Sequence, residues 1–291
     1  MAELASLGSL PLRARCLADA VGPGRHRSRR RGASVEFADY RDYHAGDDLR
    51  RLDWRLLART DRAHIRQSHD ESPLRVLLLL DVSASMDYAS DARLLSKLDY
   101  ARALLGAVAL IARRQRDACG VGLMGENLQD YLPAAQSAAR WQSLWAKLES
   151  PPLARTASVA RALDEALNVA RGPTFFVAAS DYYEEPAVLH PVLGRLRHEG
   201  HDLLALQVAD PQEEDFLFSE AGHFEDAETG QRLALDPIAA APAYRAAYAA
   251  HRAQLTEEFI ASGFEHVRLR TDVPPLAGLG AYLARRAGRS R

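Results

Sequence analysis

The chain has 291 residues, 47% of them hydrophobic and 26% charged, which is ordinary for a globular protein. A chain of this length can bury a sizeable core without disulfides, either as one large domain or as a domain with an appendage. The formal net charge of −2 argues against general affinity for nucleic acid.

The two cysteines, Cys16 and Cys119, are too few for a cysteine-based metal site and favour a reducing compartment. The chain does not begin with a basic region followed by an apolar segment, the pattern of a secretory signal. No stretch approaches the roughly 20 apolar residues that cross a bilayer. We therefore expect a cytoplasmic protein without a membrane span.

The N-terminal segment combines a predicted helix with a strongly basic run. Residues 3–21 have helical spacing of apolar side chains, interrupted by Gly8 and Pro11. The basic run that follows contains Arg25, Arg27, Arg29, Arg30 and Arg31. Such a run either binds an anion or an acidic partner or forms a solvated loop.

Residues 35–60 mix aspartate, arginine and aromatic residues at high density. We expect this segment to form a strap held down by paired arginine and carboxylate groups. A short strand at 64–67 would then lead into the core. The predicted organisation is an N-terminal helix and strap over residues 1–70, followed by an α/β domain over residues 71–291.

The first strand of that domain carries the most informative pattern in the chain. Residues 76–80 are all apolar, which is typical of a strand buried on both faces in a parallel sheet. Asp81 follows at the carboxyl end of the strand, where open α/β sheets bind their ligands. With the hydroxyls of Ser83 and Ser85, it places three oxygens on one loop, a set suited to Mg²⁺, Mn²⁺ or Ca²⁺.

Further strands and helices alternate along the rest of the chain. Strands are expected at residues 119–124, 128–132, 174–179, 202–208 and 266–270. Helices are expected at residues 91–114, with Asp91 as N-cap, and at 136–148, 159–170, 184–199, 242–262 and 274–286. An insertion at about 211–240 contains a hairpin that turns near Thr229-Gly230. The alternation predicts a doubly wound, mostly parallel sheet flanked by helices.

Two more polar residues belong with the first loop. Asp181 follows the strand at 174–179, and Thr156 precedes the helix at 159–170. The set resembles the metal-ion-dependent adhesion site of von Willebrand factor A-type domains. Asp81, Ser83 and Ser85 match its first loop, Thr156 its second and Asp181 its third.

The N-terminal half carries a second pattern, spaced as in one bacterial family. Its parts are Ser28-Arg29, Glu36-Phe37, Tyr40-Arg41-Asp42-Tyr43, Gly46-Asp47-Asp48-Leu49-Arg50, Asp53-Trp54 and Ala58-Arg59-Thr60. This combination resembles the family called domain of unknown function 58. The resemblance covers residues from about 24 to 210 and implies a fold like that of von Willebrand factor A domains.

The function implied by the resemblance is binding rather than catalysis. Ser83, Ser85 and Thr156 would contact the metal directly, with Mg²⁺ expected, while Asp81 and Asp181 would act through water and hydrogen bonds. The cation would then attract a glutamate or aspartate of a partner protein. The family's partner is expected to be a MoxR-type AAA+ ATPase, so the implied role is that of an adaptor or co-chaperone.

Two alternatives remain open from the sequence. A haloacid-dehalogenase-type phosphatase also places an aspartate after an apolar strand, but it needs a second carboxylate where this chain has Ser83. The other alternative is an anion or nucleic-acid binder that uses Arg25–Arg31; its binding would weaken steeply with salt and survive the loss of Asp81. We expect a protein that is not an enzyme.

Overall fold

The computed structural model describes residues 2–21, 39–42, 64–67, 73–220 and 222–274. These residues belong to two compact units, one of which contains residues 2–21 and 75–274 and the other the strands at 39–42 and 64–67. The basic run Arg25–Arg31, most of the expected strap and the expected closing helix lie outside the described residues.

The larger unit is built on a six-stranded sheet with the strand order β10-β7-β6-β3-β4-β5. The strands are β3 (Arg75–Asp81), β4 (Ala118–Met124), β5 (Leu128–Ala135), β6 (Thr174–Ser180), β7 (Asp202–Ala209) and β10 (Glu265–Arg270). All neighbouring strands pair in parallel except β5, which runs antiparallel to β4. The mostly parallel sheet confirms the predicted fold class.

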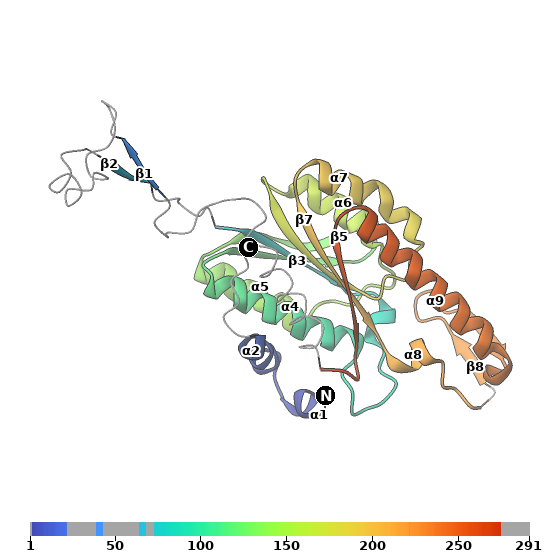
Figure 1. The fold of residues 1–291 in the computed structure, drawn as a ribbon. Coiled ribbons are helices and arrows are strands. Elements are labelled where there is room, and N and C mark those ends of the chain that lie inside the picture. The colour runs from blue at the N-terminus through green and yellow to red at the C-terminus, as the bar shows by residue number, and fades with distance from the viewer. Residues whose placement is uncertain (1, 22–38, 43–63, 68–72, 221, 275–291) are drawn as a thin grey trace. The chain divides into compact units, whose positions relative to one another are not determined.

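Helices cover both faces of this sheet (Figure 1). Helix α4 packs against β3 and β4 on one face, with α5 beside it and α2 behind it, while α6, α7 and α9 cover the other face. The helices are α1 (Ala2–Ser6), α2 (Leu10–Val21), α4 (Lys97–Arg114), α5 (Ala138–Glu149), α6 (Val159–Val169), α7 (His190–His198), α8 (Pro211–Asp215) and α9 (Pro237–Ala261). Two 3₁₀ turns, η2 (Ala84–Asp87) and η3 (Pro186–Leu189), follow β3 and β6. Within the described ranges, no helix is long and apolar enough to cross a membrane.

Strand β3 lies at the centre because its side chains are apolar on both faces. Leu78, Leu79 and Leu80 have no exposed surface, and β3 pairs with β4 on one side and β6 on the other. The prediction of a strand buried on both faces is confirmed, and it sets Asp81 at the carboxyl-end edge of the sheet.

The start of helix α4 differs from the prediction. The helix expected to begin at Asp91 begins at Lys97, and its N-cap is Ser96, whose hydroxyl accepts a hydrogen bond from the backbone N–H of Asp99 at 3.1 Å. The carboxylate of Asp91 instead binds the backbone and guanidinium of Arg93. This local pairing leaves Asp91 in a turn before the helix.

Helix α9 begins earlier than predicted, at Pro237 rather than Pro242. Asp236 caps it by accepting hydrogen bonds from the backbone of Ile238 and Ala239 at 3.0 and 3.3 Å. Proline is compatible with a first helical position because its missing N–H has no partner there. Pro242 therefore lies inside the helix.

Two small antiparallel sheets complete the described structure. In one, β1 (Asp39–Asp42) pairs with β2 (His64–Gln67), so the strand predicted at 64–67 is present but its partner is β1. In the other, β8 (Gly222–Glu225) pairs with β9 (Arg232–Leu235), which confirms the hairpin predicted in the insertion.

Candidate metal site

Parallel strands β3 and β6 bring Asp81 and Asp181 to the same edge of the sheet, because they are neighbours and both end there. Asp81 is buried, and both of its carboxylate oxygens are engaged. Oδ1 accepts a hydrogen bond from the backbone N–H of Ser83 at 2.8 Å, and Oδ2 accepts one from the hydroxyl of Ser180 at 2.6 Å. Asp81 therefore joins the loop after β3 to the end of β6.

A chain of hydroxyls links this loop to Asp181. The hydroxyl oxygens of Ser83 and Ser85 lie 3.0 Å apart, and the Ser85 hydroxyl donates to Oδ2 of Asp181 at 2.8 Å. Four of the five residues predicted to form a metal site thus make one hydrogen-bonded group. Ser180 belongs to it as well, although the sequence showed only that this serine precedes Asp181.

Thr156 lies on a neighbouring loop but outside this group. Its loop is joined to the first one by a hydrogen bond from the N–H of Ala154 to the carbonyl of Val82 at 2.8 Å. The Thr156 hydroxyl donates to Oε1 of Glu126 at 3.2 Å. Among the described residues, it makes no hydrogen bond to any of the other four predicted metal-site residues.

Lys97 is a charged member of the site that sequence reasoning missed. Its side chain has no exposed surface, and its ammonium lies 2.9 Å from Oδ2 of Asp181 and 2.7 Å from Oε1 of Glu213. Burial lowers the pKa of Lys97, but attraction to the two acids outweighs burial and raises this pKa above its ordinary value. The site therefore contains a permanent cation. The only sequence signal was that Lys97 is one of two lysines in the chain.

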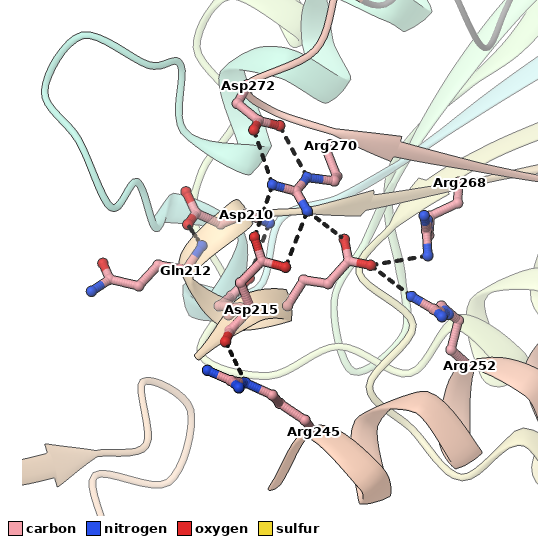
Figure 2. Close-up of polar contacts among 10 residues, drawn as sticks. Asp210, Gln212, Asp215, Arg245, Arg252, Arg268, Arg270 and Asp272 are labelled. Carbon is pink, nitrogen blue, oxygen red and sulfur yellow. Dashed lines mark hydrogen bonds and ion pairs between the residues drawn. The ribbon is translucent and has the colours of Figure 1, made fainter. Parts of the chain in front are cut away.

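Arginines bind the short helix α8, which carries Glu213 (Figure 2). Oε1 of Glu214 accepts from Arg252 at 2.6 Å and from Arg268 at 2.9 Å. Asp215 binds Arg270 at 3.0 Å, and Asp210 caps the helix. These contacts fix α8 beside the site, so Glu213 meets Lys97 in a set geometry.

The electrostatics of the site favour an additional cation. Burial and, second, the charge of Asp181 raise the pKa of Asp81 to about 7. The Ser85 hydroxyl has one proton, which it donates to Asp181. Burial raises the pKa of Glu228 and a hydrogen bond from the same hydroxyl lowers it, so two carboxylates share one donor. The site thus presents more acceptor oxygens than donors, and a cation would balance them.

The donor atoms decide which metals fit. In the described part of the chain, no three His, Cys, Asp or Glu side chains gather as metal ligands. The candidate site instead consists of serine hydroxyls with two carboxylates. Hard oxygen donors of this kind suit Mg²⁺, Mn²⁺ or Ca²⁺ rather than zinc or copper. The residues present fit a divalent cation bound largely by neutral oxygens.

The doubly wound, mostly parallel sheet with the Asp-x-Ser-x-Ser loop after its central strand is the arrangement expected from the resemblance to von Willebrand factor A domains. The family model described as "Protein of unknown function DUF58" matches residues 39–258. The chain therefore belongs to this family, as the sequence resemblance predicted.

Relatives with similar sequences occur in mycobacteria. The uncharacterized protein Rv1480 of Mycobacterium tuberculosis is 29% identical over 290 residues, which cover 97% of this chain and 89% of the relative. The uncharacterized protein Mb1516 of Mycobacterium bovis matches with the same identity and coverage.

Several solved structures also match this chain. BatB from Bacteroides thetaiotaomicron is 13% identical with a TM-score of 0.47, and the match covers 74% of this chain and 98% of BatB. An aerotolerance-related membrane protein from Bacteroides fragilis is 15% identical with a TM-score of 0.48, covering 74% of this chain and 99% of that one. The VWA domain of SpRpn10 is 12% identical with a TM-score of 0.40, covering 73% and 94%.

Proposed function

We propose that this chain is a metal-dependent binding protein that is not an enzyme. It would hold a divalent cation, foremost Mg²⁺, at the carboxyl-end edge of the sheet and present it to an acidic residue of a partner. The observation that carries the proposal is the hydrogen-bonded group of Asp81, Ser83, Ser85 and Asp181, which gathers hard oxygen donors at this edge. A bound cation supplies the positive charge that such a group lacks.

Each predicted metal-site residue has a role that follows from its donor group. The hydroxyls of Ser83, Ser85 and Thr156 would bind the cation, which requires Thr156 to release Glu126. Asp81 and Asp181 would orient these hydroxyls through hydrogen bonds and bridging water. A cation bound by neutral oxygens keeps most of its charge and therefore attracts a carboxylate from outside.

The engagement of Asp81 supports a binding role over a phosphatase role. Both of its oxygens accept hydrogen bonds, at 2.8 and 2.6 Å, and only 2% of the residue is exposed. A carboxylate in this state orients its neighbours and is not free to attack a phosphorus atom. Position 83 also supplies a hydroxyl where that chemistry needs a general acid.

The proposed partner is a MoxR-type AAA+ ATPase, with this chain as its adaptor in assembling or activating other proteins. This part of the proposal rests on the family resemblance. It predicts that the surface around the cation recognises a glutamate or aspartate of the ATPase or of its client.

A capture experiment from the native bacterial lysate tests the proposal. We expect the tagged chain to retain the ATPase, identified by mass spectrometry, in Mg²⁺ but not in chelator. Ser85→Ala should lose this capture. Ser143→Ala is a matched control, because that serine lies exposed on α5 and donates only to the Ala139 carbonyl. Equal capture by all three proteins in chelator would contradict the proposal.

A further inference from the structure

The hairpin β8–β9 reaches the candidate metal site through its tip. Arg155, the neighbour of Thr156, donates from Nε to the carbonyl of Glu228 at 2.7 Å and from Nη2 to the carbonyl of Thr229 at 2.9 Å. The guanidinium thus binds the carbonyls of two successive residues in the turn. These two hydrogen bonds hold the hairpin tip beside the loop of Thr156.

The turn itself fixes the backbone of Glu228. Oδ1 of Asp226 accepts hydrogen bonds from the backbone N–H of Glu228 at 2.8 Å and of Thr229 at 3.0 Å. Gly230, at a φ of +74°, closes the turn by donating to the carbonyl of Asp226. Because these contacts order the turn, the direction of the Glu228 side chain is built into the hairpin.

Aromatic contacts hold the strands of the hairpin. Phe224 in β8 packs against Phe216 and Phe218, with ring centroids 5.8 and 4.9 Å apart. Phe216 in turn stacks on Tyr244 of α9 at 4.3 Å. Aromatic contacts at the base and the hydrogen bonds of Arg155 at the tip therefore position the hairpin from both ends.

The charges around Ser85 indicate a role for the Glu228 carboxylate. Glu228 is half-buried. Burial raises the pKa of its carboxyl, a hydrogen bond from Ser85 lowers this pKa, and the charge of Asp181 raises it. Lys97 supplies one positive charge, but Glu213 already shares it with Asp181. Nε and Nη2 of Arg155 bind backbone carbonyls, so these two nitrogens make no ion pair with Glu228. Glu228 thus brings an additional negative charge to a site that already lacks positive charge.

We propose that Glu228 binds the cation in the free protein, at the position that the acidic residue of the partner takes in the complex. This inference rests on the proposed function. It specifies that binding is an exchange: the partner's glutamate or aspartate replaces Glu228 on the cation. The free protein would then keep its metal at the cost of weaker partner affinity, and the hairpin would determine which acidic partners can compete.

Direct metal titration tests the inference, with Mn²⁺ as the probe. Mn²⁺ binding is followed by electron paramagnetic resonance, and the waters on bound Mn²⁺ are counted by water-proton relaxation. We expect Glu228→Gln to weaken Mn²⁺ binding by at least about 10-fold, because the loss of groups that only support the ligands already costs roughly 10- to 100-fold. Mn²⁺ bound to this variant should carry one more exchangeable water than in the wild type.

The controls separate this inference from the proposed function. Glu225→Gln makes the same charge change in the same hairpin, at a side chain that pairs with Arg232 at 2.8 Å, and it should leave both readouts unchanged. Ser85→Ala should abolish binding. One outcome would contradict only the role of Glu228: Ser85→Ala abolishes Mn²⁺ binding, but Glu228→Gln matches the wild type in affinity and in the number of bound waters. The proposed metal site would then be supported without Glu228. If the wild type binds no Mn²⁺, both proposals are overturned.

Discussion

Replacing Lys97 by methionine should destabilise the protein strongly when no divalent cation is present. The ammonium has no exposed surface and contacts Asp181 at 2.9 Å and Glu213 at 2.7 Å. Methionine preserves much of the length and the apolar stem but removes the charge. Two carboxylates with 5% and 19% of their side chains exposed would then lose their counter-charge. Breaking a buried ion pair from one side costs about 3–5 kcal/mol in the free energy of unfolding.

The matched control is the only other lysine of the chain. Lys147 contacts Asp130 at 2.9 Å, with 25% and 48% of the two side chains exposed. Lys147→Met should therefore cost about 1 kcal/mol or less. Urea unfolding in chelator, followed by circular dichroism, measures both changes. In a calorimeter, the Lys97→Met loss corresponds to a decrease in Tm of roughly 6–20 °C, at about 2–4 °C per kcal/mol.

Magnesium and a second substitution make the Lys97 experiment specific. Mg²⁺ should stabilise Lys97→Met by about 2.7 kcal/mol when its concentration is 100 times the Kd of the variant. This gain should exceed that of the wild type at the same Mg²⁺ concentration, since the metal replaces the missing charge. Adding Glu213→Gln to Lys97→Met should also recover stability, because it removes one unpaired carboxylate. If Lys97→Met costs no more than Lys147→Met in chelator, the reasoning from a buried ion pair is refuted.

Two further predictions concern stability. Burial and, second, Arg268 lower the pKa of His266 from 6.5 to about 4, so His266 binds more protons in the unfolded state between these values. The contribution of His266 to the free energy of unfolding should therefore fall by up to about 3 kcal/mol as the pH drops from 6.5 to 4. His266→Phe should flatten this part of the pH profile in urea titrations, and an unchanged slope would contradict the assignment. A Cβ at Gly120 would lie 2.6 Å from the backbone nitrogen of Ala134, whereas one at Gly194, inside α7, would meet nothing within 4 Å. Gly120→Ala should therefore cost about 1–3 kcal/mol and Gly194→Ala should gain about 0.5–1 kcal/mol in thermal unfolding, and equal effects would contradict the packing at β5.

The parts of the site that could be predicted from sequence are those attached to strand ends. Apolar runs located β3 and β6, and parallel pairing then placed Asp81 and Asp181 at one edge. Lys97 and Glu213 could not be found in this way, because 116 positions separate them and their side chains meet only in the folded chain. The error at the start of α4 was local, since Asp91 and Ser96 both have side chains suited to capping.

Glu228 marks a different limit of sequence reasoning. The turn near Thr229-Gly230 was predictable from its residues, but the place of the turn in the molecule was not. The position of the turn depends on aromatic packing at Phe216 and on the hydrogen bonds of Arg155. Both arise only when the chain has folded. Local chemistry therefore predicted the hairpin, and tertiary contacts gave it a candidate function.

The edge strand β5 restricts how a second protein can dock. It pairs with β4 through two register shifts, contains Pro133, and holds Asp130 at a φ of +48°. Proline has no N–H to offer a new strand, and irregular pairing bends the edge away from the flat geometry that strand addition requires. β-Augmentation is therefore disfavoured at this edge. Any protein that met this edge would have to recognise side chains, because those contacts do not extend the sheet.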